Sequence, residues 1–447
     1  VILHVLTYPD AENVHNDKLT YMLMLAVCLA AVINAIYGIS SCSRTEYGMS
    51  MIYTGSIMGA LLAGDCITMT AFIGLSAAAG ACIIRSGDSI RSEGASFRYL
   101  IMQALGMGLL LTGLISYIFH YGNDLYAFSS CRGDTCYYTV AAGIAVLAAL
   151  APLHAWMTDG YSSSTVSGTV YLTSMHIILA AYLLLRLLPG LRILTWAGSA
   201  GAVFAACMAL AENDIRKTAA YTAVSHIGAL SAFIGLLSGA DETAAAASSA
   251  VIITFSCASV MMCLGAVYYS AGTYRMNELC GMAKKQPVTA ICFVISVISG
   301  SAGWTVIFDA FEKTEPTAQL ILITAAGAGS MLALLFRTGY LVFFRKAGSE
   351  YSDPEKELPV TMIIAMLTCT ALAVLAGARP DTTIYSMHNI LRSAALIAGS
   401  SVPFLLHRGI MKPEDGILHD FDWLLRKPLG IMTDKLSELT YRLFAGR

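Results

Sequence analysis

Long blocks of apolar residues constrain this chain more than any other feature, because each approaches the length that a lipid bilayer demands. A helix needs about 20 consecutive apolar residues to cross the hydrocarbon core. The blocks lie at residues 21–39, 99–119, 139–153, 170–188, 197–210, 219–237, 246–271, 288–311, 318–336, 360–376 and 390–406. Lipid tolerates no open sheet edge, so these blocks predict membrane-spanning helices rather than strands.

A further apolar stretch at 50–84 is too long for one span and carries Asp65 near its middle. We expect two short spans here, with Asp65 in the turn between them. Only 13% of the residues are charged, about half of the roughly 25% that is typical of soluble domains. The sequence thus predicts an all-α polytopic membrane protein of about 12 transmembrane helices, surrounded by the lipid bilayer.

The cationic residues indicate how these helices are oriented. Threaded alternately across the membrane, the segments place 20 of the 27 Lys and Arg residues on one side and 7 on the other. The positive-inside rule makes the richer side cytoplasmic. We therefore expect a multi-pass protein of the cell (cytoplasmic) membrane, with its N-terminal tail outside. The sequence begins with Val and shows no signal peptide.

The last part of the chain has a different pattern. Apolar residues alternate with charges from residue 417 to 447, and this segment is too polar to span a membrane. It predicts an amphipathic helix on the cytoplasmic side, lying on the membrane or on neighbouring subunits. We divide the chain accordingly into a transmembrane domain at 1–410 and an amphipathic helix at 411–447.

Most of the 12 cysteines lie inside predicted spans, where a thiol is an ordinary small apolar group. Cys131 and Cys136 instead belong to a predicted external loop, on the oxidising side of the membrane. Spacing alone leaves both a loop disulfide and two free thiols open. The sequence has no nucleotide-binding loop and no Cys/His cluster, so we expect no catalytic site, metal, cofactor or nucleic-acid partner for this chain.

Ionisable side chains inside apolar blocks are costly and usually have a function. The candidates are Asp65, His154, Asp159, His176, Glu212, Asp214, His226, Asp309, Glu312 and Lys313. Most of them also have a structural explanation: a loop position, an ion pair at a cytoplasmic helix end, or a hydrogen bond to nearby backbone.

His226 and Lys313 are the strongest candidates for an ion path. His226 lies in an otherwise apolar helix, and a histidine titrates near neutral pH and can pass a proton between its two nitrogens. Lys313 follows Asp309 by four residues, so the two share a helix face and the carboxylate can tune the amine. The alternative for Lys313 is a lysine that only snorkels to the membrane surface.

Two predicted spans contain helix-breaking residues. Pro152 interrupts the span that starts at 139, and Ser299-Gly-Ser-Ala-Gly303 is expected to break the one that starts at 288. The breaks are about 150 residues apart, which suits two inverted five-helix repeats containing broken helices. Transporters built from inverted repeats place their ion sites at such breaks.

Four segments, in order along the chain, carry a family resemblance. Ala151-Pro-Leu-His-Ala-Trp-Met-Thr-Asp159 resembles a Pro-Leu-His-x-Trp-Leu-Pro-Asp signature, and Val224-Ser-His-Ile-Gly228 is similar to the end of an Asp-Leu-Lys-Arg…Val-Ser-His-x-Gly motif. Gly281-Met-Ala-Lys-Lys-Gln-Pro287 looks like Gly-Leu-Ala-x-Lys-x-Pro, and His419-Asp-Phe-Asp-Trp-Leu-Leu-Arg-Lys427 like Asp-x-Asp-Trp-x-Tyr-Arg. The segments resemble the antiporter-like subunits of complex I, Mrp cation antiporters and membrane-bound (energy-converting) hydrogenases.

The resemblance implies two half-channels for protons or sodium, with lysines and one glutamate along a polar axis. Several positions that carry these groups in the family are apolar here: Gly74, Leu147, Ile178 and, close to another, Cys257. We therefore expect the N-terminal half-channel to be inactive. The expected ion path consists of Lys313, His226, Asp309, His176 and His154.

The resemblance leaves three functions open. The first is a membrane-arm subunit of a redox-driven ion pump, complex I-like or of the energy-converting hydrogenase type, bound to other membrane-arm subunits. The others are a subunit of an Mrp-like Na⁺/H⁺ antiporter and a structural scaffold that transports nothing. Asp17-Lys-Leu-Thr20 looks like the start of the family's third helix, so we expect two earlier helices to be missing here.

Overall fold

The computed structural model describes residues 17–87, 90–125, 128, 131–313, 317–345, 356–377 and 387–406. These residues belong to the first of two units, Val1–Pro413, and the predicted amphipathic helix at 411–447 lies outside them.

Every regular element among the described residues is a helix. In chain order these are α2 (Lys18–Gly38), α3 (Arg44–Leu62), α4 (Cys66–Arg85), α5 (Ile90–Tyr121), α6 (Thr135–Leu147), α7 (Ala155–Ser163), α8 (Val166–Leu187), α9 (Ile193–Ala211), α10 (Ile215–Ile234), α11 (Ala240–Ala271), α12 (Met282–Lys285), α13 (Pro287–Lys313), α14 (Thr317–Met331), the π-helix η2 (Leu332–Phe344), α15 (Val360–Gly377) and α16 (Met387–Leu406).

Ten of the described helical segments are long and apolar enough to cross a membrane. They confirm an all-α polytopic membrane protein, while the number of spans and the inverted repeats stay predictions. Helix α10 is not one of the ten, although it is buried along almost its whole length. Because its neighbours are other helices, it can carry polar residues that lipid would exclude.

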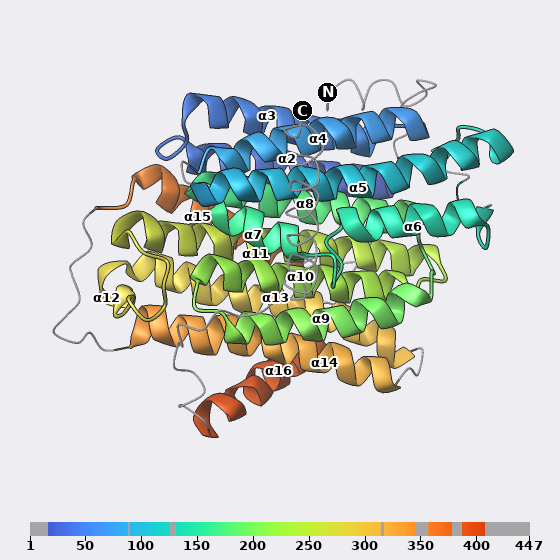
Figure 1. Cartoon of the computed structure of the whole chain (residues 1–447). Helices are drawn as coiled ribbons and strands as arrows, with labels where there is room; N and C mark the ends of the chain where they lie inside the picture. Colours follow the sequence, from blue (N-terminus) through green and yellow to red (C-terminus); the bar gives the residue numbers. More distant parts are fainter. Residues whose placement is uncertain are drawn as a thin grey trace, which may run out of the picture. The chain divides into compact units, whose positions relative to one another are not determined.

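The most buried helices are α8, α10 and α11. Helix α11 packs against α8, α13 and α15, and α10 packs closely against α9. Figure 1 shows α2–α5 on one side of these central helices, with α13, α14 and α16 on the other. Residues on α8, α10 and α11 are therefore the ones best shielded from lipid and water.

The stretch at 50–84 forms two helices, α3 and α4, as predicted. Asp65 is the N-cap of α4, and its carboxylate accepts hydrogen bonds from the backbone N–H groups of Ile67 (3.1 Å) and Thr68 (2.9 Å). A capping aspartate satisfies N–H groups that have no partner within the helix. The loop interpretation of Asp65 is therefore confirmed.

The prediction of two broken helices is half correct. Helix α6 ends at Leu147 and α7 begins at Ala155, with Ala149 in a left-handed conformation (φ 54°) between them. The indole N–H of Trp156 on α7 donates to the carbonyl of Val146 on α6 (3.1 Å), which holds the two pieces together.

The second predicted break is wrong, because α13 runs without interruption through Ser299–Gly303. Its glycines allow close packing instead: a Cβ on Gly300 would lie 2.6 Å from Ser256 Oγ, and one on Gly303 would lie 2.9 Å from Ile253 Cγ1. Both of these neighbours are on α11. The small residues thus let α13 approach α11, and the helix remains intact.

Candidate functional site

His226 is buried in the middle of α10, with 3% of its surface exposed. Its Nδ1 lies 2.6 Å from the carbonyl oxygen of Thr222, and its Nε2 lies 3.0 Å from the indole nitrogen of Trp304 on α13. A carbonyl can only accept a hydrogen bond and an indole N–H can only donate one. In this arrangement His226 is therefore neutral, with its proton on Nδ1.

A cavity of about 10 Å³ lies beside His226. Its lining includes Thr222, His226, Ser256, Cys257 and Gly300. This volume is close to the threshold for holding one water molecule, and polar groups line part of it. The site combines a titratable ring with room for a proton carrier next to it.

The other two predicted histidines are also buried, on other elements. His176 lies on α8, where its ring contacts Trp156 (centroids 5.2 Å apart) and Tyr161 (6.1 Å). His154 is the N-cap of α7, between the rings of Phe204 (5.5 Å) and Tyr221 (5.7 Å). Their part in an ion path stays a prediction.

Lys313 is the exposed last residue of α13, at the end of the helix that carries Trp304. The carboxylate of Asp309, one turn before Lys313, binds two residues of α16. Arg392 forms an ion pair with it, and Asn389 donates a hydrogen bond to it (3.3 Å). Arg392 also forms an ion pair with Glu312. Asp309 and Glu312 thus bind the mostly exposed α16 to α13. Sequence analysis missed Arg392 in this role, because a single arginine in an apolar block gives no sign of its distant partner.

A second charged group joins α5, α7, α9 and α10. Asp159 pairs with Arg98 (3.3 Å) and Lys217 (3.8 Å), and Lys217 also pairs with Glu212 (3.7 Å). Burial raises the pKa of the Glu212 carboxyl, although Lys217 opposes this effect. Asp214 caps α10 through the N–H groups of Arg216 and Lys217. These contacts agree with the ion pairs predicted for a cytoplasmic helix end.

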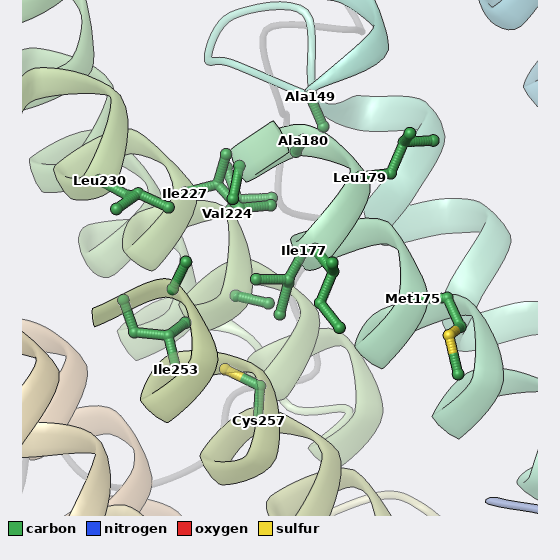
Figure 2. Packing of buried hydrophobic residues seen from close by; sticks show 14 of the residues in the cluster. Ala149, Met175, Ile177, Leu179, Ala180, Val224, Ile227, Leu230, Ile253 and Cys257 are labelled. Atoms are coloured by element: carbon green, nitrogen blue, oxygen red, sulfur yellow. The ribbon is translucent and has the colours of Figure 1, made fainter. Parts of the chain in front are cut away.

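Apolar packing fills the family positions that lack their ionisable groups. Leu147 and Ile178 are buried, and Leu147 packs directly against Gly106 of α5. Figure 2 shows Cys257 and Ile253 of α11 in one apolar cluster with Ile177 of α8. Buried hydrocarbon side chains therefore stand at two of these positions, Leu147 and Ile178, while Cys257 also lines the cavity beside His226.

Cys131 and Cys136 are buried free thiols in the structure. The thiol of Cys131 donates to the carbonyl of Phe128 at 3.0 Å. The disulfide between them stays a prediction. Among the described residues, no group of three or more His, Cys, Asp or Glu side chains is arranged to hold a metal ion.

Glu46 is a polar centre that sequence analysis did not find. This residue of α3 has 1% of its surface exposed. Its carboxylate accepts hydrogen bonds from the hydroxyls of Thr165 (2.5 Å) and Ser167 (2.7 Å) at the start of α8, and from the backbone N–H of Ser43 (3.4 Å). One carboxylate thus caps α3 and fixes the first turn of α8.

Fold and site together define a multi-pass helical membrane protein with a hydrogen-bonded histidine at its centre. Residues 63–305 match the model of the family described as "NADH:quinone oxidoreductase/Mrp antiporter, TM", which is more than half of the chain. The chain belongs to this family, as the four sequence motifs predicted.

Two curated relatives are subunits of larger enzymes. NADH-quinone oxidoreductase subunit N of Desulforudis audaxviator is 28% identical over 57% of this chain and 54% of its own length. F(420)H(2) dehydrogenase subunit L of Methanosarcina mazei is 26% identical over 50% of this chain and 37% of its own length. The chain thus spans about half, or less, of these relatives.

Solved structures extend the likeness of fold to nearly the whole chain. A chain of the membrane-bound sulfane sulfur reductase, an archaeal respiratory membrane complex, has a TM-score of 0.77 and 16% identity, covering 100% of this chain and 88% of its own. A chain of the Mrp complex of Dietzia sp. has a TM-score of 0.73 and 16% identity, covering 89% and 86%.

Proposed function

We propose that this chain is an antiporter-like membrane-arm subunit of a redox-driven, ion-translocating complex in the cell membrane, complex I-like or of the energy-converting hydrogenase type. Family membership supports this proposal, because the matched relatives are subunits of NADH-quinone oxidoreductase and F(420)H(2) dehydrogenase. The observation that carries it is His226: a neutral histidine, buried at the centre of the bundle, beside a cavity of about 10 Å³.

The translocated ion is a proton or Na⁺, and its path runs through the C-terminal half. His226 is the central group in this path, while Lys313 and Asp309 lie at its outer end on α13. His176 and His154 are two further buried titratable groups in this path. The N-terminal half-channel is inactive, because Leu147 is packed into hydrocarbon where the family places a lysine.

A subunit of an Mrp-like Na⁺/H⁺ antiporter is the second candidate. The fold similarity to the Mrp complex of Dietzia sp. favours it. Purification of the complex through a tag on this chain distinguishes the two candidate functions, since iron–sulfur subunits co-purify only with a redox-driven pump. A scaffold without transport is the third possibility, and it requires a functional test.

The test replaces His226 and Lys313 in the intact complex and measures ion pumping. His226→Gln keeps a donor and an acceptor for Thr222 and Trp304 but cannot titrate, and Lys313→Met removes the amine. We expect both variants to assemble and to lose pumping, whereas Lys284→Met, at an exposed position on α12, pumps normally. Unchanged pumping in His226→Gln and Lys313→Met would instead identify a scaffold.

A further inference from the structure

One of the helices that line the cavity beside His226 changes its type at the cavity itself. Helix α14 is α-helical as far as Met331, and the next 13 residues form the π-helix η2. Met331 and Leu334 lie on the two sides of this junction, and both line the cavity of about 10 Å³. Most π-helical segments are single turns inside α-helices, and they are frequent at functional sites. A π-helix of this length therefore indicates that η2 has a function at the cavity.

Arg345 fixes the predicted cytoplasmic end of η2. Its Nη2 donates to three carbonyl oxygens in the loop between α11 and α12, those of Met276 (3.3 Å), Asn277 (2.9 Å) and Leu279 (2.7 Å). This loop is bonded in turn to the start of α10, because the N–H of Met276 donates to the carbonyl of Asn213 (2.9 Å). The end of η2 is thus connected to the helix that carries the candidate site.

Arg337, in the middle of η2, is held less firmly. Only 2% of its surface is exposed. Its Nη1 donates to the backbone carbonyl of Glu212 and contacts Met276 Sδ (3.5 Å), and both of these groups are uncharged. The Glu212 carboxylate attracts the guanidinium from a distance, but it forms its ion pair with Lys217 (3.7 Å). Among the described residues, the buried Nε of Arg337 has no hydrogen-bond partner.

The charge of Arg337 makes this packed position costly. A buried guanidinium with an unsatisfied donor loses hydration that its present contacts do not replace. An arginine in a membrane helix usually extends its long side chain toward the nearest aqueous surface. Arg337 lies on the predicted cytoplasmic half of its span, so cytoplasmic water is the nearest. The charge therefore favours a second state, in which Arg337 has left the Glu212 carbonyl.

A change of helix type gives η2 a way to reach this second state. In a π-helix each N–H bonds to the carbonyl five positions back, as the N–H of Arg345 does to Tyr340 (2.7 Å), whereas in an α-helix it bonds four positions back. Rewinding η2 as an α-helix would therefore turn its side chains around the helix axis. Because Arg345 holds one end, this turn would displace Met331 and Leu334 at the other end from the cavity.

We propose that η2 is a gate between His226 and the cytoplasm, closed in this structure, and that the buried charge of Arg337 keeps the gate ready to open. This proposal rests on the proposed function and adds its regulation: the cavity exchanges water or ions with the cytoplasm while Met331 and Leu334 are displaced. Arg337 is a positioning residue, because it acts on the cavity through η2.

Cys257 reports on the gate, since its buried thiol lines the same cavity. The complex is purified through a tag on this chain and treated with methyl methanethiosulfonate while it pumps, and mass spectrometry gives the labelling rate of each cysteine. Arg337→Met fills the same space without a charge. We expect it to slow both Cys257 labelling and ion pumping about tenfold, because apolar replacement of buried charge commonly stabilises the packed state by this order. Arg337→Lys, which keeps the charge, should behave like the wild type.

Two controls accompany this test. Cys369 is buried on α15, where its thiol donates to the Phe255 carbonyl (3.4 Å), and its labelling rate should be the same in every variant. Arg275→Met removes an exposed cation from the loop that holds η2, where Arg275 pairs with Glu278 (3.8 Å). This variant should pump, and label at Cys257, at the wild-type rate.

A purely structural anchor would give the opposite result. Faster labelling of Cys257 in Arg337→Met, with or without faster labelling of Cys369, would make Arg337 such an anchor and overturn the gate. Unchanged labelling would also overturn it, as would a Cys257 that stays unlabelled in the pumping wild type. None of these results affects the proposed function, which fails if His226→Gln and Lys313→Met both pump normally.

Discussion

Trp304 determines which nitrogen of His226 carries the proton. The indole N–H occupies Nε2, the nitrogen that would accept a further proton, so His226 can be protonated only after this bond opens. The ring also contacts Trp304 directly, with centroids 5.2 Å apart. A movement of α13 relative to α10 that breaks this bond therefore frees Nε2 to accept a proton. The two residues form a coupled pair, and Trp304 is the positioning member.

We predict that Trp304→Phe releases Nε2 and alters the ¹⁵N signals of His226. Loss of this bond should lower the unfolding free energy in detergent by about 1 kcal/mol, within the range for hydrogen bonds between membrane helices. Trp196→Phe is the control, because Trp196 is 54% exposed on α9. Histidine ¹⁵N spectra that stay unchanged in Trp304→Phe would contradict the assigned bond.

Glu46 is expected to stabilise the fold more than a surface carboxylate does. Glu46→Gln replaces one acceptor oxygen with an amide N–H₂, so the bonds from Thr165, Ser167 and Ser43 cannot all persist. Hydrogen bonds to charged groups contribute about 1.5–3 kcal/mol to stability. We expect Glu46→Gln to lower the free energy of unfolding by an amount in this range, as measured by denaturant unfolding. Glu93→Gln, which breaks only an exposed pair with Arg85, should cost less than about 1 kcal/mol.

Single residues were predictable from the sequence only where they were chemically out of place. His226 stood out because a histidine is rare in an apolar helix. Trp304 did not, since an aromatic residue in an apolar block looks like ordinary core, and its partner lies 78 positions away. Glu46 gave no signal either, because its partners on α8 are about 120 positions away. Pairings of this kind arise from folding and leave no local pattern.

Among the helices, the two predicted breaks had different outcomes for a physical reason. Proline removes a backbone donor, so Pro152 favours an interruption of its span, although α16 continues through Pro403. Glycine permits either a bend or a close approach of another helix, and only the neighbours decide between them. Gly300 and Gly303 pack closely against α11, and α13 is continuous through this region. The sequence alone could not distinguish these outcomes.

Gly300→Ala is predicted to disturb the contact between α13 and α11. Its Cβ would lie 2.6 Å from Ser256 Oγ, well inside normal contact distance, so the Ser256 hydroxyl must turn away from the Ser296 carbonyl or the helices must shift apart. We expect the free energy of unfolding to fall by about 1–3 kcal/mol, as it does in overpacked cores. Ion pumping should be lost as well. Gly108→Ala on α5, where a Cβ would meet nothing within 4 Å, should instead stabilise the protein slightly. Thermal unfolding in detergent gives the Tm of both variants, and equal changes in Tm would contradict the close packing at Gly300.

The turn between α3 and α4 should give a measurable pH dependence. Burial alone would raise the pKa of Asp65, but hydrogen bonds from Thr68 and Ile67 outweigh it and hold this pKa below the ordinary value of 3.8. The cap therefore contributes its full stability above pH 3.8 and loses it as the pH falls through the lowered pKa. Asp65→Ala should cost about 1 kcal/mol at pH 7 and less at pH 3. Asp65→Asn, which caps without titrating, should show a smaller pH dependence than the wild type.

For the whole molecule, the apolar blocks and the charge distribution predicted the fold class before any contact was known. They predicted a span at 219–237, but they could not show that this helix, α10, is enclosed by other helices. The apolar blocks and the charge distribution also could not show which helices the ion pairs connect. The group of Arg98, Asp159, Lys217 and Glu212 lies on the predicted cytoplasmic side, and that of Arg392, Asp309 and Glu312 on the predicted outer side.

Orientation in the membrane decides which of these groups faces the cytoplasm, and it can be measured in intact cells. Arg192 and Lys284 are both exposed, before α9 and on α12, and the charge bias assigns them to opposite sides. A membrane-impermeant maleimide should therefore label Arg192→Cys in intact cells and Lys284→Cys only after permeabilisation, above the background of the wild-type cysteines. The reverse pattern would place Lys313 and Asp309 at the cytoplasmic end of α13, and not at the outer end of the proposed ion path.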